Sequence, residues 1–169
     1  SQTTNEREKG YVTKLFYLSL AYHASRSTFF KLKLADILLK LDNNDLVIRS
    51  LENIKDTDIF YLDTTLQKLT ALHQNDQKNK ADNIIKELLE RNFYSSEILK
   101  FHANVQRKNL FYSDSIETYS KALEVAEKEG NEKETWSILF LRGIAYERKK
   151  DWSSAEKDFI NALAINPEQ

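Results

Sequence analysis

The chain has 169 residues, of which 41% are hydrophobic, and its 25 basic and 26 acidic residues leave a formal net charge of −1. This length suits one globular unit or a short array of repeats, and the interspersed charges give no basic surface for nucleic acid. The absence of cysteine excludes disulfides and thiolate sites, and no apolar run approaches the ~18 residues that would span a bilayer, so we expect no membrane insertion.

The distribution of helix breakers predicts an all-α fold. Only one proline and three glycines are present, and the alternation of β-branched residues that is typical of strands is missing. Polar turns separate apolar stretches of helical length. We therefore expect about nine helices, at residues 5–25, 27–41, 44–55, 58–74, 78–91, 95–108, 112–128, 132–149 and 152–164.

Small residues recur at a fixed interval in the second half of each predicted helix pair. Val47, Ala81, Ser115 and Ala155 are spaced by 34, 34 and 40 residues. A six-residue insertion at 126–135 explains the longer interval, and we expect the helices on both sides to extend and meet at Gly130. Such a period is typical of a solenoid. The predicted array has a partial repeat or cap helix at 5–25 and repeats at 28–61, 62–95, 96–135 and 136–169.

Two further columns predict how the helices of a pair meet. The first helices share a small or apolar position, at Ala35, Leu69, Ala103 and Gly143. The second helices share a bulky position, at Leu51, Ile85, Tyr119 and Phe159. Each helix then has an apolar stripe that only stacking on neighbours can bury. Tyr17 and Leu20 stand 34 residues before Leu51 and Ile54, so residues 5–25 are expected to be the second helix of a repeat without its first helix.

The last repeat resembles the tetratricopeptide repeat family. Its anchors are Gly143, Tyr146, Ala155, Phe159, Ala162 and Pro167. The stretches 136–148 and 152–159 are also similar to large bacterial repeat proteins that are often exported, which would place the chain in a bacterial periplasm or cytoplasm. The absence of any methionine, with Ser1 at the start, predicts a processed or excised piece.

The resemblance implies a right-handed α-solenoid of antiparallel helix pairs. Its first helices would line a concave face that binds a peptide or helix of a partner protein. On that face we expect Phe29, Leu32, Leu66, Lys100, Asn104, Arg107, Phe140 and Ile144. Lys100 and Asn104 have the spacing that grips a terminal carboxylate in chaperone-binding members of the family, but Leu141 stands where that clamp has an amide.

The sequence offers no motif for catalysis, and we expect no catalytic residue, metal or cofactor. His23, His73 and His102 lie on different predicted helices, and none has a histidine or glutamate partner four residues away that would make a metal pair. Three glycines are too few for a phosphate-binding loop. The expected function is a non-catalytic protein–protein interaction scaffold. The alternative is a structural segment of a longer superhelix that stacks on itself or forms a homo-oligomer.

Overall fold

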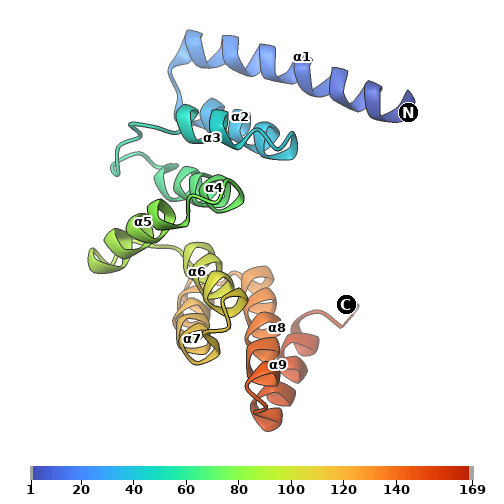
Figure 1. Cartoon of the computed structure of the whole chain (residues 1–169), viewed down its shortest axis with the longest axis vertical. Helices are drawn as coiled ribbons and strands as arrows, with labels where there is room; N and C mark the ends of the chain where they lie inside the picture. Colours follow the sequence, from blue (N-terminus) through green and yellow to red (C-terminus); the bar gives the residue numbers. More distant parts are fainter. Residues whose placement is uncertain (1, 168–169) are drawn as a thin grey trace. The chain divides into compact units, whose positions relative to one another are not determined.

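The structure is a computed structural model that describes residues 2–167, with side chains over residues 10–167. Over that range the chain forms nine α-helices and no strand, so the predicted all-α class is confirmed (Figure 1). The helices are α1 (Gln2–Ser25), α2 (Thr28–Lys40), α3 (Asn44–Ser50), α4 (Tyr61–Gln74), α5 (Lys78–Glu90), α6 (Ser96–Lys108), α7 (Tyr112–Glu129), α8 (Glu132–Arg148) and α9 (Trp152–Ile165).

The segment between α3 and α4 departs from the prediction. Helices were expected at 44–55 and 58–74, but α3 ends at Ser50 and α4 begins at Tyr61. Asn53 is left-handed, with φ 59°, which is incompatible with a continuing helix. The Asp58 carboxylate then accepts hydrogen bonds from the Phe60 N–H, at 2.9 Å, and from the Thr28 hydroxyl. These bonds hold residues 51–60 as a turn against the start of α2.

The turn inside each helix pair has the same backbone conformation four times. Left-handed residues end the first helix of each pair, at Asp42, Asp76, Leu110 and Lys150. The next N–H donates to a carbonyl five residues earlier, in the bonds Asn43 to Leu38, Gln77 to Leu72, Phe111 to Gln106 and Asp151 to Tyr146, at 2.8–2.9 Å. This is the Schellman cap of a helix C-terminus. Its intervals match those of the small-residue column, so the repeat is present in the backbone as well as in the sequence.

The predicted insertion joins α7 and α8. Helix α7 runs to Glu129, Gly130 follows with φ 64°, and α8 begins at Glu132. The Asn131 side chain caps α8 by accepting from the Glu134 N–H at 3.2 Å. Both helices therefore extend and meet at the glycine, as expected.

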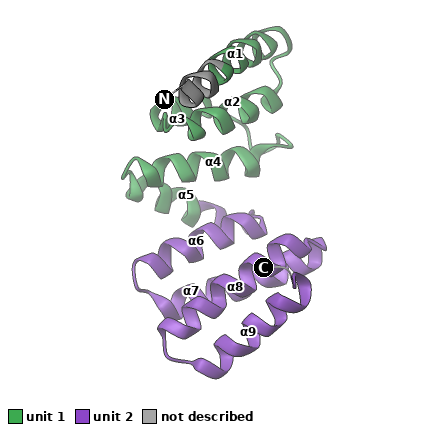
Figure 2. Ribbon diagram, turned by 90° about the vertical axis from the view of Figure 1, so that its right-hand side faces the viewer, with its two compact units in different colours: residues 1–86 green, residues 87–169 purple. Residues whose placement is uncertain are grey.

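The chain divides into two compact units, residues 1–86 (unit 1) and 87–169 (unit 2), where length and composition favoured one (Figure 2). In unit 1, α1 packs on α2, α2 on α3 and α3 on α4, and α2 also packs on α4. In unit 2, α6, α7, α8 and α9 pack in order, and α6 also packs on α8. Helices α2 and α6 thus each contact their own second helix and the first helix of the next pair. This is the connectivity of an all-α helical repeat; a right-handed superhelix stays a prediction.

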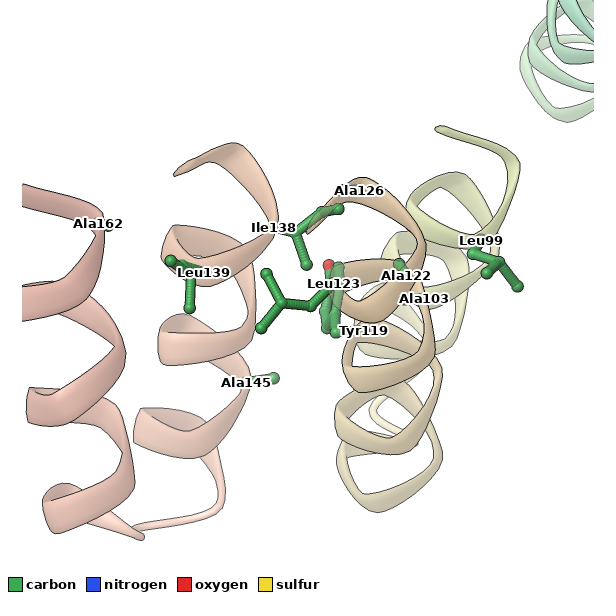
Figure 3. Close-up of a cluster of buried hydrophobic side chains, with 10 residues drawn as sticks. All are labelled: Leu99, Ala103, Tyr119, Ala122, Leu123, Ala126, Ile138, Leu139, Ala145 and Ala162. Carbon is green, nitrogen blue, oxygen red and sulfur yellow. The ribbon is translucent and has the colours of Figure 1, made fainter. Parts of the chain in front are cut away.

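The aligned columns occupy equivalent environments. Val47, Ala81, Ser115 and Ala155 are all buried, as are Ala35, Leu69 and Ala103 on the first helices. In unit 2 a cluster of ten buried residues, from Leu99 to Ala162, forms the core, with Tyr119 at its centre (Figure 3). Gly143 has a packing reason: a Cβ there would lie 2.6 Å from the Phe159 ring. Close approach of α8 and α9 therefore requires glycine at this position.

Candidate peptide-binding face

The candidate site consists of the first-helix side chains that the second helices leave uncovered. In unit 1 they come from α2 and α4, and in unit 2 from α6 and α8. We call these two sets the first-helix faces, and each belongs to its own unit. Helix α2 contacts α4, and helix α6 contacts α8. These contacts bring the residues of each face together.

The first-helix face of unit 1 has an aromatic ring with a cation above it, and that cation also lies 3.8 Å from the Asp36 carboxylate. Phe29 is 40% exposed, and its ring centroid lies 5.5 Å from that of Phe30 and 5.8 Å from that of Phe60. The Lys33 ammonium stands 5.5 Å from the Phe29 centroid, within reach of a cation–π contact. Leu32 and Leu66, also predicted here, are half-buried. This face can take an apolar side chain of a ligand.

A buried amide fixes the spacing of α2 and α4. The Gln67 Nε2 donates to the Leu32 carbonyl at 3.1 Å and to the Asp36 carboxylate. Because a buried amide must keep its partners, this contact makes the relative position of the two helices specific. Sequence reasoning missed Gln67, since nothing in its local pattern separates it from an exposed glutamine.

The first-helix face of unit 2 is polar on α6. The Lys100 ammonium pairs with the Glu134 carboxylate of α8 at 2.7 Å, and both side chains are largely covered. Asn104 Oδ1 accepts from the Tyr119 hydroxyl at 2.8 Å and from Arg107 at 3.3 Å. Burial raises the pKa of Tyr119, and Arg107 beside it acts in the opposite direction. These polar side chains are therefore engaged with one another.

That engagement bears on the predicted roles of Lys100, Asn104 and Arg107. A carboxylate clamp needs an ammonium and an amide that are available to a ligand. Here Glu134 already neutralises Lys100, and the Asn104 oxygen is shared by two donors. The Lys100–Glu134 ion pair joins α6 and α8, the first helices of successive repeats. The structure thereby gives Lys100 a packing role that its spacing from Asn104 did not predict.

The α8 part of the same face is aromatic. Phe140 is 43% exposed and stacks on Trp136, with centroids 5.9 Å apart and ring planes 8° apart. Its other neighbour is Phe159, at 5.8 Å. Ile144, one turn further along, is half-buried. Trp136 was not among the predicted site residues, although its position four residues before Phe140 was the signal for it.

A buried ion pair lies on the other side of α8. Arg142 donates to Asp158 through Nε at 2.7 Å and Nη2 at 2.8 Å, and through Nη1 to the Ser120 hydroxyl at 3.0 Å. The side chains of Arg142 and Asp158 are 15% and 4% exposed. The hydrogen bond to Asp158 raises the pKa of Arg142. This network joins α7, α8 and α9, and a cavity of about 460 Å³ beside it is lined by Leu139 and Tyr146 among others.

Among the residues that the structure describes, no three histidine, cysteine, aspartate or glutamate side chains lie together as a metal ion would need. Over the same residues, none of the helices has the length and apolar character required to cross a bilayer.

The fold and this face define the class as an all-α helical repeat protein. No protein-family model matches the chain, and no curated protein matches it. The resemblance to tetratricopeptide repeats therefore rests on the residues of the last repeat alone.

Proposed function

We propose that this chain is a non-catalytic scaffold of the tetratricopeptide type that binds a peptide or helix of a partner protein through its first-helix faces. The observation that carries the proposal is that each first-helix face has a partly exposed aromatic ring held in place by other rings. Phe29 and Phe140 each keep about two fifths of their surface exposed while other rings hold them in place. Rings that are already ordered lose little conformational entropy on binding, so they suit the role of anchors.

The polar part of the unit 2 face fits this role as a rim. Lys100 is paired with the Glu134 carboxylate, whereas Arg107 donates to the neutral side chains of Asn104 and Tyr119 and keeps its positive charge. A ligand that places an apolar side chain against Phe140 and a backbone carbonyl near Arg107 would use both parts. Charges at the rim of an interface affect the association rate more than the affinity.

The test is a selection of phage-displayed random peptides on the immobilised chain, followed by affinity measurements with variants. We expect Phe140→Ala to weaken the selected peptides about tenfold or more, as for an aromatic anchor. Ile160→Ala is the matched control, because Ile160 is also an exposed apolar residue but lies on the second helix α9. An equal loss of affinity in Phe140→Ala and in Ile160→Ala would reject the proposal. So would unchanged affinity in both Phe140→Ala and Phe29→Ala.

Charge reversal at Lys100 is a poor test of binding. A glutamate there would face Glu134 at ion-pair distance, and two carboxylates at that separation repel each other. The variant would lose stability whatever its effect on a ligand. Lys100→Gln is the milder change because it removes the positive charge without adding a second carboxylate. A helicity measurement should accompany it.

A structural role in a longer superhelix remains the second candidate, and one observation favours it. Ile160 and Leu163 on α9 are both more than half exposed, and they stand on one helix face. Exposed apolar residues at the end of a repeat array are the surface on which another repeat would stack. Sedimentation velocity over a range of concentrations tests this role: self-association that Leu163→Glu abolishes would favour it.

A further inference from the structure

The Arg107 side chain on α6 is held in place by two neutral oxygens. Its Nε donates to the Tyr119 hydroxyl at 3.4 Å, and its Nη2 donates to Asn104 Oδ1 at 3.3 Å. Tyr119 in turn donates its hydroxyl hydrogen to Asn104 Oδ1 at 2.8 Å. Burial raises the pKa of Tyr119, so the phenol stays neutral at neutral pH. The guanidinium is therefore ordered by its neighbours and is not neutralised by them.

One edge of this guanidinium is bonded, and the other edge is available to a ligand. In a planar guanidinium, Nε and Nη2 form one edge, and Nη1 and Nη2 form another. The Nη1 of Arg107 makes no hydrogen bond within the described residues, and it is not one of the buried side-chain atoms that lack a partner. It therefore faces solvent, in a side chain that is only partly exposed. The Nη1–Nη2 edge can thus bind a carboxylate through two parallel hydrogen bonds.

The charge of Arg107 is uncompensated, unlike that of the other two cations placed on the first-helix faces. Lys33 lies 3.8 Å from the Asp36 carboxylate in unit 1, and Lys100 pairs with Glu134 in unit 2. Within the described part of the chain, no carboxylate lies at ion-pair distance from Arg107. A partly covered cation without an anionic partner gains most from an acid that a ligand supplies.

Arg107 lies level with the aromatic part of the unit 2 face. Helices α6 and α8 run in the same direction, because the chain reverses at each of the two turns between them (Figure 2). The Lys100–Glu134 pair fixes their register, and Arg107 and Leu141 each stand seven residues further along. Leu141 is the neighbour of Phe140 in the chain. Because the axes of packed helices are about 8–10 Å apart, about three extended residues of a ligand bridge Arg107 and Phe140.

We propose that the first-helix face of unit 2 selects peptides with an aspartate or glutamate side chain, whose carboxylate binds the Nη1–Nη2 edge of Arg107. An apolar side chain about three residues away packs on Phe140. This preference rests on the proposed function and names the class of peptide for the same site. In unit 1 the cation beside Phe29 already has its carboxylate, so the preference for acids belongs to unit 2.

The test begins with a random peptide library on phage in which the C-terminus of every peptide is fused to the coat protein. Side chains are then the source of every carboxylate that a peptide offers. Selection on the immobilised full chain should enrich aspartate or glutamate about three residues from an aromatic or aliphatic residue. The strongest peptide is then synthesised with blocked ends and a fluorescent label, beside a version in which asparagine or glutamine replaces the acid. Fluorescence anisotropy gives the affinity of both peptides.

A double-mutant cycle then assigns the carboxylate to Arg107. Arg107→Gln should weaken the acidic peptide about fivefold or more, mainly through faster dissociation, because the guanidinium is partly covered. The amide version should lose as much on the wild type, but it should bind Arg107→Gln and the wild type equally. Lys108→Gln is the matched control, because it removes the same charge from the next, exposed residue on another side of α6, and it should change the affinity by less than about twofold. Circular dichroism confirms that each variant keeps its helices.

Three outcomes would overturn the preference for acids. One is a set of selected peptides without enrichment of aspartate or glutamate, and another is an equal loss of affinity in Arg107→Gln and Lys108→Gln. The third is a loss on removing the acid that is the same for the wild type and for Arg107→Gln, since the carboxylate would then contact another residue. If Phe140→Ala or Phe29→Ala still weakens the peptides, the proposed function survives these outcomes. Affinity that neither phenylalanine variant changes, or the absence of any selected peptide, would reject the proposed function as well.

Discussion

Unit 1 and unit 2 both alternate first and second helices, but α3, one second helix of unit 1, is shorter than α7 and α9 of unit 2. Helix α3 of unit 1 has 7 residues, whereas α7 and α9 of unit 2 have 18 and 14. Leu51 stands just beyond the end of α3, yet it is buried like its counterparts Ile85 and Tyr119. This column position is therefore buried at the expected interval even though α3 ends before it.

The two units also bury different chemistry. The described core cluster of unit 1 is aliphatic and small, with Ala35, Val47 and Leu51 among its members. Unit 2 adds a buried tyrosine and the Arg142–Asp158 ion pair. Both tryptophans, Trp136 and Trp152, lie in unit 2, so tryptophan fluorescence follows that unit alone and circular dichroism follows both. This difference makes the units separately measurable.

The largest effect is expected from Arg142→Ala in unit 2. It leaves the Asp158 carboxylate buried without its partner, which costs about 3–5 kcal/mol. In urea unfolding the tryptophan transition should move to lower concentration, and circular dichroism should keep a transition from unit 1. The double change Arg142→Met with Asp158→Leu should recover much of the loss, because well-packed apolar residues can replace a buried ion pair.

The control for that experiment is an exposed ion pair on the same unit. Lys121 and Glu117 are 2.8 Å apart on the surface of α7, and Lys121→Ala should leave the urea midpoint unchanged. An unchanged midpoint in Arg142→Ala would show that the buried pair does not hold α8 to α9.

Replacing a glycine by alanine should have a smaller effect on stability, and its sign should differ between a glycine of unit 1 and a glycine of unit 2. Gly143→Ala pushes a methyl group into the Phe159 ring and should cost about 1–2 kcal/mol after the gain in helix propensity. Gly10→Ala in α1 meets nothing within 4 Å and should stabilise unit 1 by up to about 1 kcal/mol. Thermal unfolding by circular dichroism and by fluorescence separates the two, and loss of stability in both variants would contradict the packing reason given for Gly143.

The smallest effect concerns Asp58 in the turn of unit 1. Hydrogen bonds from Thr28 and from the Phe60 N–H lower the pKa of Asp58 below its ordinary value of 3.8. A lowered pKa stabilises the fold at pH values above 3.8, and that contribution disappears as the pH falls through the lowered value. Asp58→Asn should therefore loosen this turn at neutral pH and make no difference in strong acid.

Amide hydrogen exchange at Phe60 measures this local effect. We expect faster exchange in Asp58→Asn than in the wild type at neutral pH, with the two rates converging in acid. A rate difference that persists below the lowered pKa would assign the protection to the backbone of the turn and not to the carboxylate.

The sequence determined which positions are buried and how often they recur. The interval between Val47, Ala81, Ser115 and Ala155 predicted the helix pairs, and Gly130 predicted the joint of α7 and α8, because both signals are local or strictly periodic. Handedness, partner and binding residues stay predictions. The early end of α3 was not predicted, since it depends on a left-handed Asn53 and on the contact of Asp58 with a helix start 30 residues away.

Tertiary structure alone decided which polar side chains meet. Lys100 finds Glu134 and Arg142 finds Asp158 across 34 and 16 residues, and nothing in either local pattern distinguishes them from solvated surface charges. It also decided that α1 would bury one apolar stripe and expose the other. Periodicity places a side chain on a helix face, but only the packed neighbours determine what that face contacts.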